Sequence, residues 1–152
     1  MNEEWTPAVC VSLLIRRPPL EVWEAFVDPD QIRRFWLASS SGPLTPGSTV
    51  RWAFKVAGAE TEVTVVAAVP GESLDLRWDD GQPLTITFEG RGNSTLVTIR
   101  VTEFRGDTPI ANAVESTAGF TLVLASLKIW LEHGIEGELV YDRFPDAEYA
   151  DR

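Results

Sequence analysis

Residues 15–30 have the sequence IRRPPLEVWEAFVDPD, and this stretch decides how the N-terminal part of the chain folds. Before it, the apolar run 9–15 predicts a strand that the Pro-Pro pair ends. Pro19 suits the first turn of a helix, and the apolar side chains that follow form one face of it. Asp28 then caps a second short helix that has Pro29 in its first position. That second helix places Ile32, Phe35 and Trp36 on one side.

The middle of the chain, residues 49–104, alternates apolar and polar residues with the two-residue period of a half-buried strand. Turn signals such as Asp80-Gly81 divide it into short runs. The pattern predicts a five-stranded antiparallel meander with one apolar and one solvated face, after a loop at 39–48. The predicted strands span residues 49–57, 60–69, 74–79, 84–89 and 97–102.

The alternation also assigns residues to the two faces of this sheet. In the first predicted strand, Arg51 and Lys55 take the solvated face. The apolar face of the first two strands carries Val50, Trp52, Phe54, Val56, Val63, Val65, Ala67 and Val69.

In residues 120–135 the apolar residues again have the spacing of a helix. Apolar side chains recur at spacings of three or four residues, which predicts one stripe on a long helix that ends near Gly134. The order of elements predicts an α+β domain in which a curved antiparallel sheet wraps around this last helix. The stripe consists of Phe120, Leu124, Leu127, Leu131 and Ile135, widened by Val123 and Trp130.

Length and composition limit the kinds of protein this can be. The 152 residues suit one domain, and 44% hydrophobic with 24% charged residues is typical of globular chains. The net charge of −10 would repel phosphate backbones and anionic lipid headgroups, so we expect no nucleic-acid partner. The N-terminus lacks a basic region that leads into an apolar segment, and no stretch approaches the roughly 18 apolar residues of a spanning helix. We therefore expect a cytoplasmic protein without membrane insertion.

The end of the chain is strongly acidic. Residues 132–152 hold seven acidic and two basic side chains, which account for half of the net charge of −10. We divide the chain into a domain at 1–136 and an acidic C-terminal tail at 137–152. The apolar residues near Tyr141 would dock this tail on the domain, whereas the part beyond Pro145 either docks or frays.

Side chains that carry chemistry are few. Cys10 and His133 are the single residues of their types, which leaves no internal disulfide, no zinc site built from these types and no Ser-His-Asp triad. His133 falls in the last helical turn, where a cation complements the helix dipole. Glu103 either points inward, as its parity indicates, or is turned outward by a bulge, which avoids burying a lone carboxylate. We predict no catalytic residue, no metal site and no cofactor.

Two stretches together resemble one protein family. Residues 15–30, followed by Phe35-Trp36, resemble the opening of the Hsp90-ATPase-activator-homologue branch of the START-like (SRPBCC, helix-grip) superfamily. The family's closing helix is similar to Gly119-Phe120, Leu124, Leu127-Lys128, Leu131-Glu132 and Gly134. The resemblance covers about residues 9–135. It implies a helix-grip (START/Bet v 1-like) fold, in which the sheet curls around the C-terminal helix and leaves an elongated cavity.

On that fold, the inward-facing apolar residues would surround the cavity, which suits a small apolar or aromatic molecule. The alternative is that the same side chains fill the interior completely, as in most domains of this size. Relatives often carry a histidine where this chain has Val101, so a polar role at that position is absent. The candidate ligand-binding residues are Trp36, Trp52, Phe54, Trp78, Phe88, Val101, Phe120 and Leu124.

Three functions remain open. The first is a small-molecule-binding protein, the second an enzyme like the polyketide cyclases and aromatases of the superfamily, and the third a protein-interaction module. An apolar cavity supports binding, converging buried polar groups support catalysis, and a large exposed apolar patch supports a protein partner. Eukaryotic activators carry an additional N-terminal domain for which this chain has no room, so we do not transfer chaperone activation to it.

Overall fold

A single antiparallel sheet of seven strands organises residues 5–149, the part of the chain that the computed structural model describes. The strands are β1 (Val9–Ile15), β2 (Ser39–Ser40), β3 (Thr49–Ala53), β4 (Glu60–Val69), β5 (Ser73–Arg77), β6 (Pro83–Arg91) and β7 (Ser94–Val101). Their order in the sheet is β1-β7-β6-β5-β4-β3-β2. This order confirms the predicted meander and first strand. The short strand β2, which pairs with β3, lies inside the segment 39–48 that was predicted to be a loop.

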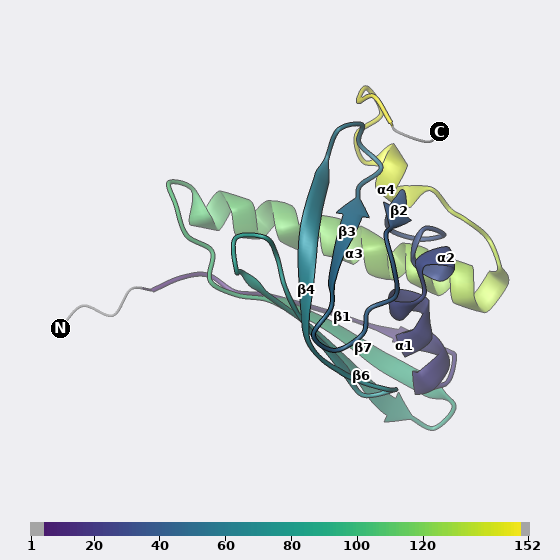
Figure 1. The fold of residues 1–152 in the computed structure, drawn as a ribbon. Helices are drawn as coiled ribbons and strands as arrows, with labels where there is room; N and C mark the ends of the chain where they lie inside the picture. The colour runs from purple at the N-terminus through teal and green to yellow at the C-terminus, as the bar shows by residue number, and fades with distance from the viewer. Residues whose placement is uncertain (1–4, 150–152) are drawn as a thin grey trace.

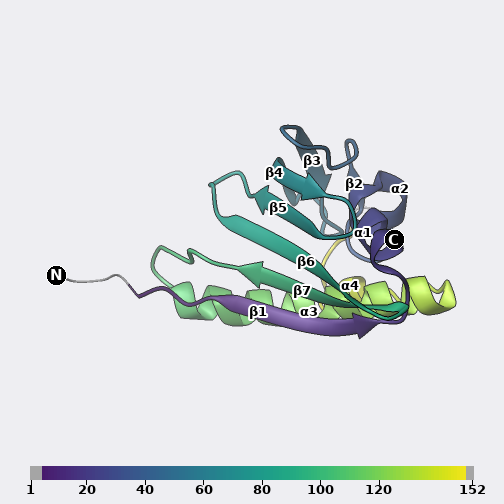
Figure 2. The ribbon, with the colours of Figure 1, turned by 90° about the horizontal axis from the view of Figure 1, so that it is seen from below.

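Four helices complete the fold within these residues: α1 (Pro19–Val27), α2 (Pro29–Ile32), α3 (Pro109–His133) and α4 (Leu139–Asp142). The Asp28 side chain accepts a hydrogen bond of 2.8 Å from the Asp30 backbone N–H and caps α2, as predicted. The long helix α3 passes behind β3 and β4 in Figure 1. Figure 2 shows the strands fanning away from α3, whose backbone comes closest to β1. The architecture is the predicted α+β helix-grip fold.

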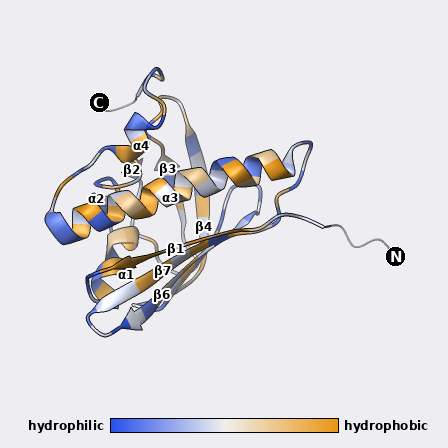
Figure 3. Ribbon diagram, turned by 180° about the vertical axis from the view of Figure 1, so that it is seen from behind, coloured by the Kyte–Doolittle hydropathy of each residue, from blue (hydrophilic) through white to orange (hydrophobic). Residues whose placement is uncertain are grey.

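The hydrophobic core lies between the inner face of the sheet and the helices α1 and α3. Phe26 of α1 contacts Phe35 and Phe88 edge to face, with ring centroids 5.2 and 5.7 Å apart. Figure 3 shows hydrophobic residues recurring along most of α3. The strand residues with no exposed surface include Val63, Val65, Leu74, Leu76, Leu84, Ile86, Val97 and Ile99.

By length and composition alone, α3 is the one helix among the described residues that could cross a membrane. Phe120, Leu124 and Leu127 of this helix are buried in the core, so packing against the sheet accounts for its apolar stripe. Gly134, in the left-handed conformation with φ of 68°, ends the helix. Ile135 lies beyond that end and is 57% exposed, so its predicted place in the stripe is wrong.

The end of β3 departs from the predicted alternation. The strand ends at Ala53, and the Phe54 N–H donates to the Ala59 carbonyl at 2.8 Å across the turn that follows. Beyond this point Lys55 is buried, with 8% exposure, and Val56 is 36% exposed, the reverse of the predicted faces. Alternation assigns faces only while the strand continues, and here the chain turns first.

A bulge causes a second departure in β4. The register of β4 against β5 shifts between Val65 and Ala67, so that an extra residue enters the strand. Beyond the bulge Ala68 packs against the core and Val69 is 41% exposed. The predicted inward position of Val69 is therefore wrong.

A polar network fixes the end of β1 to α3. Lys128 Nζ donates to the Leu14 carbonyl at 2.8 Å and to Glu132 Oε2 at 2.6 Å. The Arg16 backbone N–H donates to the same carboxylate oxygen at 2.9 Å. Burial raises the pKa of Glu132, but the hydrogen bonds and positive charges of Lys128 and Arg16 outweigh burial and lower that pKa below its ordinary value. Glu132 therefore stays ionised while it joins strand to helix.

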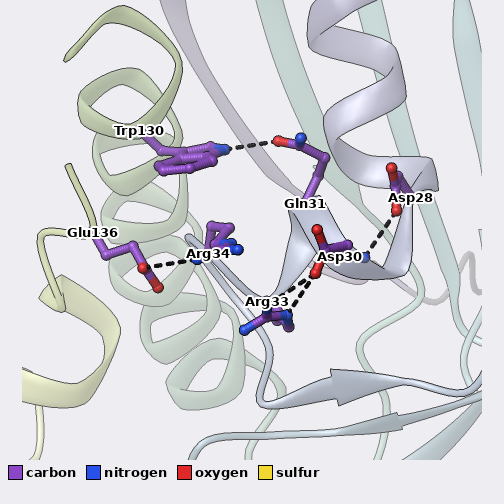
Figure 4. Close-up of polar contacts among 7 residues, drawn as sticks. All are labelled: Asp28, Asp30, Gln31, Arg33, Arg34, Trp130 and Glu136. Carbon is purple, nitrogen blue, oxygen red and sulfur yellow. Dashed lines mark hydrogen bonds and ion pairs between the residues drawn. The ribbon is translucent and has the colours of Figure 1, made fainter. Parts of the chain in front are cut away.

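A second set of polar contacts joins the α2 region to the end of α3 (Figure 4). Trp130 Nε1–H donates to Gln31 Oε1 at 2.8 Å, and the Arg34 guanidinium lies 5.5 Å above the centre of the Trp130 ring. Arg34 Nη1 also donates to Glu136 Oε2 at 3.2 Å. These contacts hold in place the chain that leads from α2 to Trp36.

Residues 137–149 fold back onto the rest of the molecule. Tyr141 of α4 is buried, and the Lys55 ammonium lies 4.2 Å from the centre of its ring. The Ala57 N–H donates to the Glu148 carbonyl at 2.9 Å, and Val56 pairs with Tyr149 in an isolated bridge. The predicted tail is therefore docked on the domain as far as residue 149. Residues 150–152 lie outside the described part of the chain.

Candidate functional site

A cavity of about 390 Å³ lies between α3, the turn after β3, the end of β5 and the C-terminal segment 137–149. The helix contributes Phe120 and Val123, and the C-terminal segment contributes Val140 and Phe144. Since α3 comes closest to β1, at the opposite edge of the sheet, the curl of the remaining strands leaves space beside β3 and β5. The cavity wall is almost entirely apolar.

Four of the candidate ligand-binding residues line this cavity: Trp36, Phe54, Trp78 and Phe120. They follow α2, β3 and β5 or lie on α3, so four separate segments each supply a ring. Trp36 and Phe120 meet edge to face with centroids 5.6 Å apart, and Phe54 and Trp78 lie 6.2 Å apart. The fold therefore gathers aromatic surface that is dispersed in the sequence.

The other four candidates, Trp52, Phe88, Val101 and Leu124, are buried in the packed core rather than at the cavity wall. Trp52 is completely buried, and its ring lies 4.9 Å from that of Trp36 and 5.7 Å from that of Trp78. It thus packs directly against two cavity-lining rings. Within the described residues, its indole Nε1 has no hydrogen-bond partner. These four side chains fill the interior, which is the alternative to a cavity that the sequence analysis left open.

Polar groups at the cavity come from residues that the sequence did not indicate. Lys55 was predicted to be solvated, Glu115 precedes the apolar stripe, and Arg143 belongs to the acidic tail. Arg143 Nη2 donates to the Glu115 carbonyl at 3.1 Å and to its Oε2 at 2.6 Å. The turn after β3 and the docking of the C-terminal segment bring these residues to the cavity wall, and no local sequence pattern predicts either feature. The ammonium of Lys55 itself lies against the Tyr141 ring and the Arg33 carbonyl, which line a neighbouring hollow.

The arrangement is better suited to binding than to acid–base catalysis. The carboxylate at the cavity wall, that of Glu115, belongs to a side chain that is 70% exposed. His133 is exposed in the last turn of α3, as predicted. Glu103 is also exposed, with a positive φ of 58°, and lies 3.7 Å from the Arg105 guanidinium, so the outward alternative is correct. Among residues 5–149, no three His, Cys, Asp or Glu side chains form a group that could hold a metal ion.

A second hollow, of about 500 Å³, lies among the loops that contain Asp80, Gln82 and Glu103. Its wall is mainly polar, and none of the candidate ligand-binding residues lines it. The apolar cavity is therefore the candidate site.

Comparison with known proteins identifies the family. A family model described as "Activator of Hsp90 ATPase homolog 1-like protein" matches residues 16–132. Among solved structures, protein SSP2350 from Staphylococcus saprophyticus is similar with a TM-score of 0.77 and 28% identity, over 85% of this chain and 94% of that one. DynU16, from the dynemicin biosynthetic locus, has a TM-score of 0.76 and 25% identity, over 85% of this chain and 48% of its own.

A more distant structure, the Aha1 dimer from Colwellia psychrerythraea, has a TM-score of 0.71 at 19% identity, over 84% of this chain and 98% of that one, and shows likeness of fold alone. A comparison with curated proteins gives no match. The family model spans most of the chain and confirms the resemblance found in the sequence. The chain belongs to the family of Activator of Hsp90 ATPase homolog 1-like proteins.

Proposed function

We propose that this protein binds a small apolar or aromatic molecule in the cavity between α3, the sheet and the C-terminal segment. The observation that carries the proposal is the convergence of Trp36, Phe54, Trp78 and Phe120, from four segments, on one apolar cavity of about 390 Å³. Small-molecule sites typically have volumes of about 300–1,000 Å³ and a mainly apolar wall with a few polar groups. The single cysteine, Cys10, is exposed and unpaired, which suits the reducing cytoplasm that we propose as its location.

An enzyme related to the polyketide cyclases is the second candidate. DynU16, which resembles this chain, belongs to the dynemicin biosynthetic locus, and that is the observation in its favour. Acid–base catalysis requires at least two polar groups that converge on a substrate with suitable pKa values. The Glu115 carboxylate instead pairs with Arg143 near solvent. Binding without turnover therefore agrees better with the cavity.

The test is a calorimetric titration of the protein with naphthalene-2-carboxamide, a neutral aromatic probe. We expect saturable binding that Trp78→Ala weakens by about tenfold or more, because the variant removes a ring from the cavity wall. Trp5→Ala is the matched control, since Trp5 is 74% exposed and does not line the cavity. Equal affinity in both variants, or no saturable binding, contradicts the proposal.

A further inference from the structure

We propose that the C-terminal segment 137–149 is a lid that closes over the ligand in this cavity, so that ligand binding and docking of the segment favour each other. The inference rests on the proposed binding function and adds its regulation. Val140, Arg143 and Phe144 of the segment form part of the cavity wall. A ligand that contacts these side chains binds more tightly when the segment is docked, and it stabilises the docked state to the same extent.

The segment separates the cavity from a neighbouring hollow. This hollow of about 490 Å³ has a mainly apolar wall, and the segment forms it together with the turn after β3 (Figure 1). Val56, Arg143 and Phe144 line both spaces. Phe144 is 45% exposed and Val56 is 36% exposed, so both side chains also reach the surface. Displacing the segment would therefore join the two spaces and open the cavity to solvent on this side.

Contacts within the segment make it a compact unit. The Tyr149 hydroxyl donates to the carbonyls of Tyr141 and Phe144. The rings of Tyr141 and Tyr149 meet edge to face with their centroids 4.8 Å apart. The Asp142 N–H donates to the Glu138 carbonyl at 2.9 Å. Because both partners of each contact belong to the segment, it can move as a unit and keep all of these contacts.

The chain that enters the segment offers an anchor followed by a bend. Arg34 Nη1 donates to Glu136 Oε2 at 3.2 Å, which ties position 136 to the α2 region. Two residues later, Glu138 has a positive φ of 56°, a conformation that residues other than glycine rarely adopt. Hinges are typically a few loop residues that absorb changes in φ and ψ. Gly137 and Glu138, between the anchor and the compact unit, are therefore the hinge of the lid.

Contacts close to solvent help to hold the segment closed. Arg143 Nη2 donates to the Glu115 carbonyl at 3.1 Å and to its Oε2 at 2.6 Å, but the Glu115 side chain is 70% exposed, and ion pairs in such positions are worth little. The Ala57 N–H donates to the Glu148 carbonyl at 2.9 Å. Tyr141, in contrast, is buried. Opening the lid would expose its ring to water, so the open state is the minor one.

Gly119 of α3 leaves room for the Arg143 head group in the closed state. A Cβ added at Gly119 would lie 2.7 Å from Arg143 Nη1, closer than a real contact permits. Because Nη1 is the end of a flexible side chain, the guanidinium would move aside rather than the helix. Alanine also favours the helical conformation more than glycine does. Gly119→Ala should therefore weaken the closure of the lid without weakening α3 and without changing a charge.

The test measures hydrogen exchange of single backbone amides by NMR. The Ala57 N–H is bonded to the Glu148 carbonyl across the edge of the lid, whereas the Phe54 N–H is bonded to the Ala59 carbonyl within the turn and is the internal control. In the wild type, naphthalene-2-carboxamide at ten times its Kd should slow exchange at Ala57 about tenfold. A ligand that binds the closed state alone stabilises it by a factor of one plus the ratio of its concentration to its Kd.

Two variants test the closure without the probe. Glu115→Gln and Gly119→Ala should each speed exchange at Ala57 about threefold or more, because each loosens the Arg143 contact, and should leave exchange at Phe54 within about twofold. Glu89→Gln, at an exposed pair with Arg91 on β6, is the matched control and should change neither rate.

The possible outcomes separate the lid from the binding function. Saturable binding of the probe in calorimetry with unchanged exchange at Ala57 overturns the lid and leaves the binding function standing. Equal acceleration at Ala57 and Phe54 in Glu115→Gln and Gly119→Ala also overturns the lid, because it reports a general loss of stability. If the probe shows no saturable binding, the proposed function fails, and a lid over that site fails with it.

Discussion

At the scale of single residues, the end of a strand decides whether a cation is solvated or buried. Lys55 follows Arg51 at a spacing that places both on one face of an unbroken strand. Because β3 ends at Ala53, Lys55 is instead enclosed between the Arg33 carbonyl and the Tyr141 ring. Its methylene groups and ammonium thereby help to hold the C-terminal segment against the domain.

We predict that Lys55→Met lowers the free energy of unfolding by about 1–2 kcal/mol, because it removes a partly desolvated cation–π contact while it retains most of the apolar stem. The measurement is urea unfolding followed by tryptophan fluorescence. Arg51→Met is the matched control, since the Arg51 side chain is 60% exposed and its contacts to Glu60 and Glu62 are 3.7 Å long. Equal effects of the two variants would show that Lys55 is solvated.

At the scale of elements, the packing of α3 on β1 depends on one shared carboxylate. Glu132 Oε2 accepts hydrogen bonds from Lys128 Nζ and from the Arg16 N–H, and the Glu132 side chain is only 10% exposed. The lowered pKa of Glu132 means that folding favours its ionised form. Its contribution to stability is therefore complete above the ordinary glutamate pKa and is lost as the pH falls through the lower pKa of the folded state.

We predict that Glu132→Gln lowers the free energy of unfolding at neutral pH by about 1.5–3 kcal/mol, the range for hydrogen bonds to charged groups. As the pH falls through the folded-state pKa, the wild-type carboxyl becomes neutral, and the difference between the two proteins should shrink. Denaturant unfolding at a series of pH values measures this difference. Glu89→Gln, at an exposed pair with Arg91, should have little effect. A difference between wild type and Glu132→Gln that is independent of pH would contradict the account.

The same scale explains which parts of the fold the sequence could predict. Periodicity located β1 and the meander, and the Pro and Asp signals located α1 and α2, because these features depend on local pairing and capping. Periodicity failed at the Val65–Ala67 bulge and after Ala53, because pairing irregularities depend on neighbouring strands. A single-sequence pattern contains no information about those neighbours.

At the scale of the whole molecule, the cavity results from the unequal distance between α3 and the two edges of the sheet. Trp36, Phe54, Trp78 and Phe120 line it because the strands curl away from α3 on their side, whereas Trp52 is enclosed behind other rings. The sequence predicted an inward aromatic face but could not separate these two groups. It also could not place the C-terminal segment at the cavity, whose wall includes Val140 and Phe144.

The six tryptophans allow one direct test of the cavity. Trp36 and Trp78 line it, and Trp52 contacts both of their rings. The other three lie elsewhere: Trp5 is exposed, Trp23 Nε1–H donates to the Ser73 carbonyl, and Trp130 Nε1–H donates to Gln31. Each indole N–H gives its own signal in a ¹H–¹⁵N correlation spectrum.

The deciding measurement is a titration of the ¹⁵N-labelled protein with naphthalene-2-carboxamide, monitored through the six indole signals. The account predicts saturating shifts of the signals of Trp36 and Trp78, which lie within reach of the ring current of the probe. It also predicts a shift of the signal of Trp52, whose ring packs against both and follows their displacement, with the other three signals unchanged. Saturating shifts confined to Trp5, Trp23 or Trp130, or no saturating shift at any indole, would contradict the claim that this cavity binds an aromatic molecule.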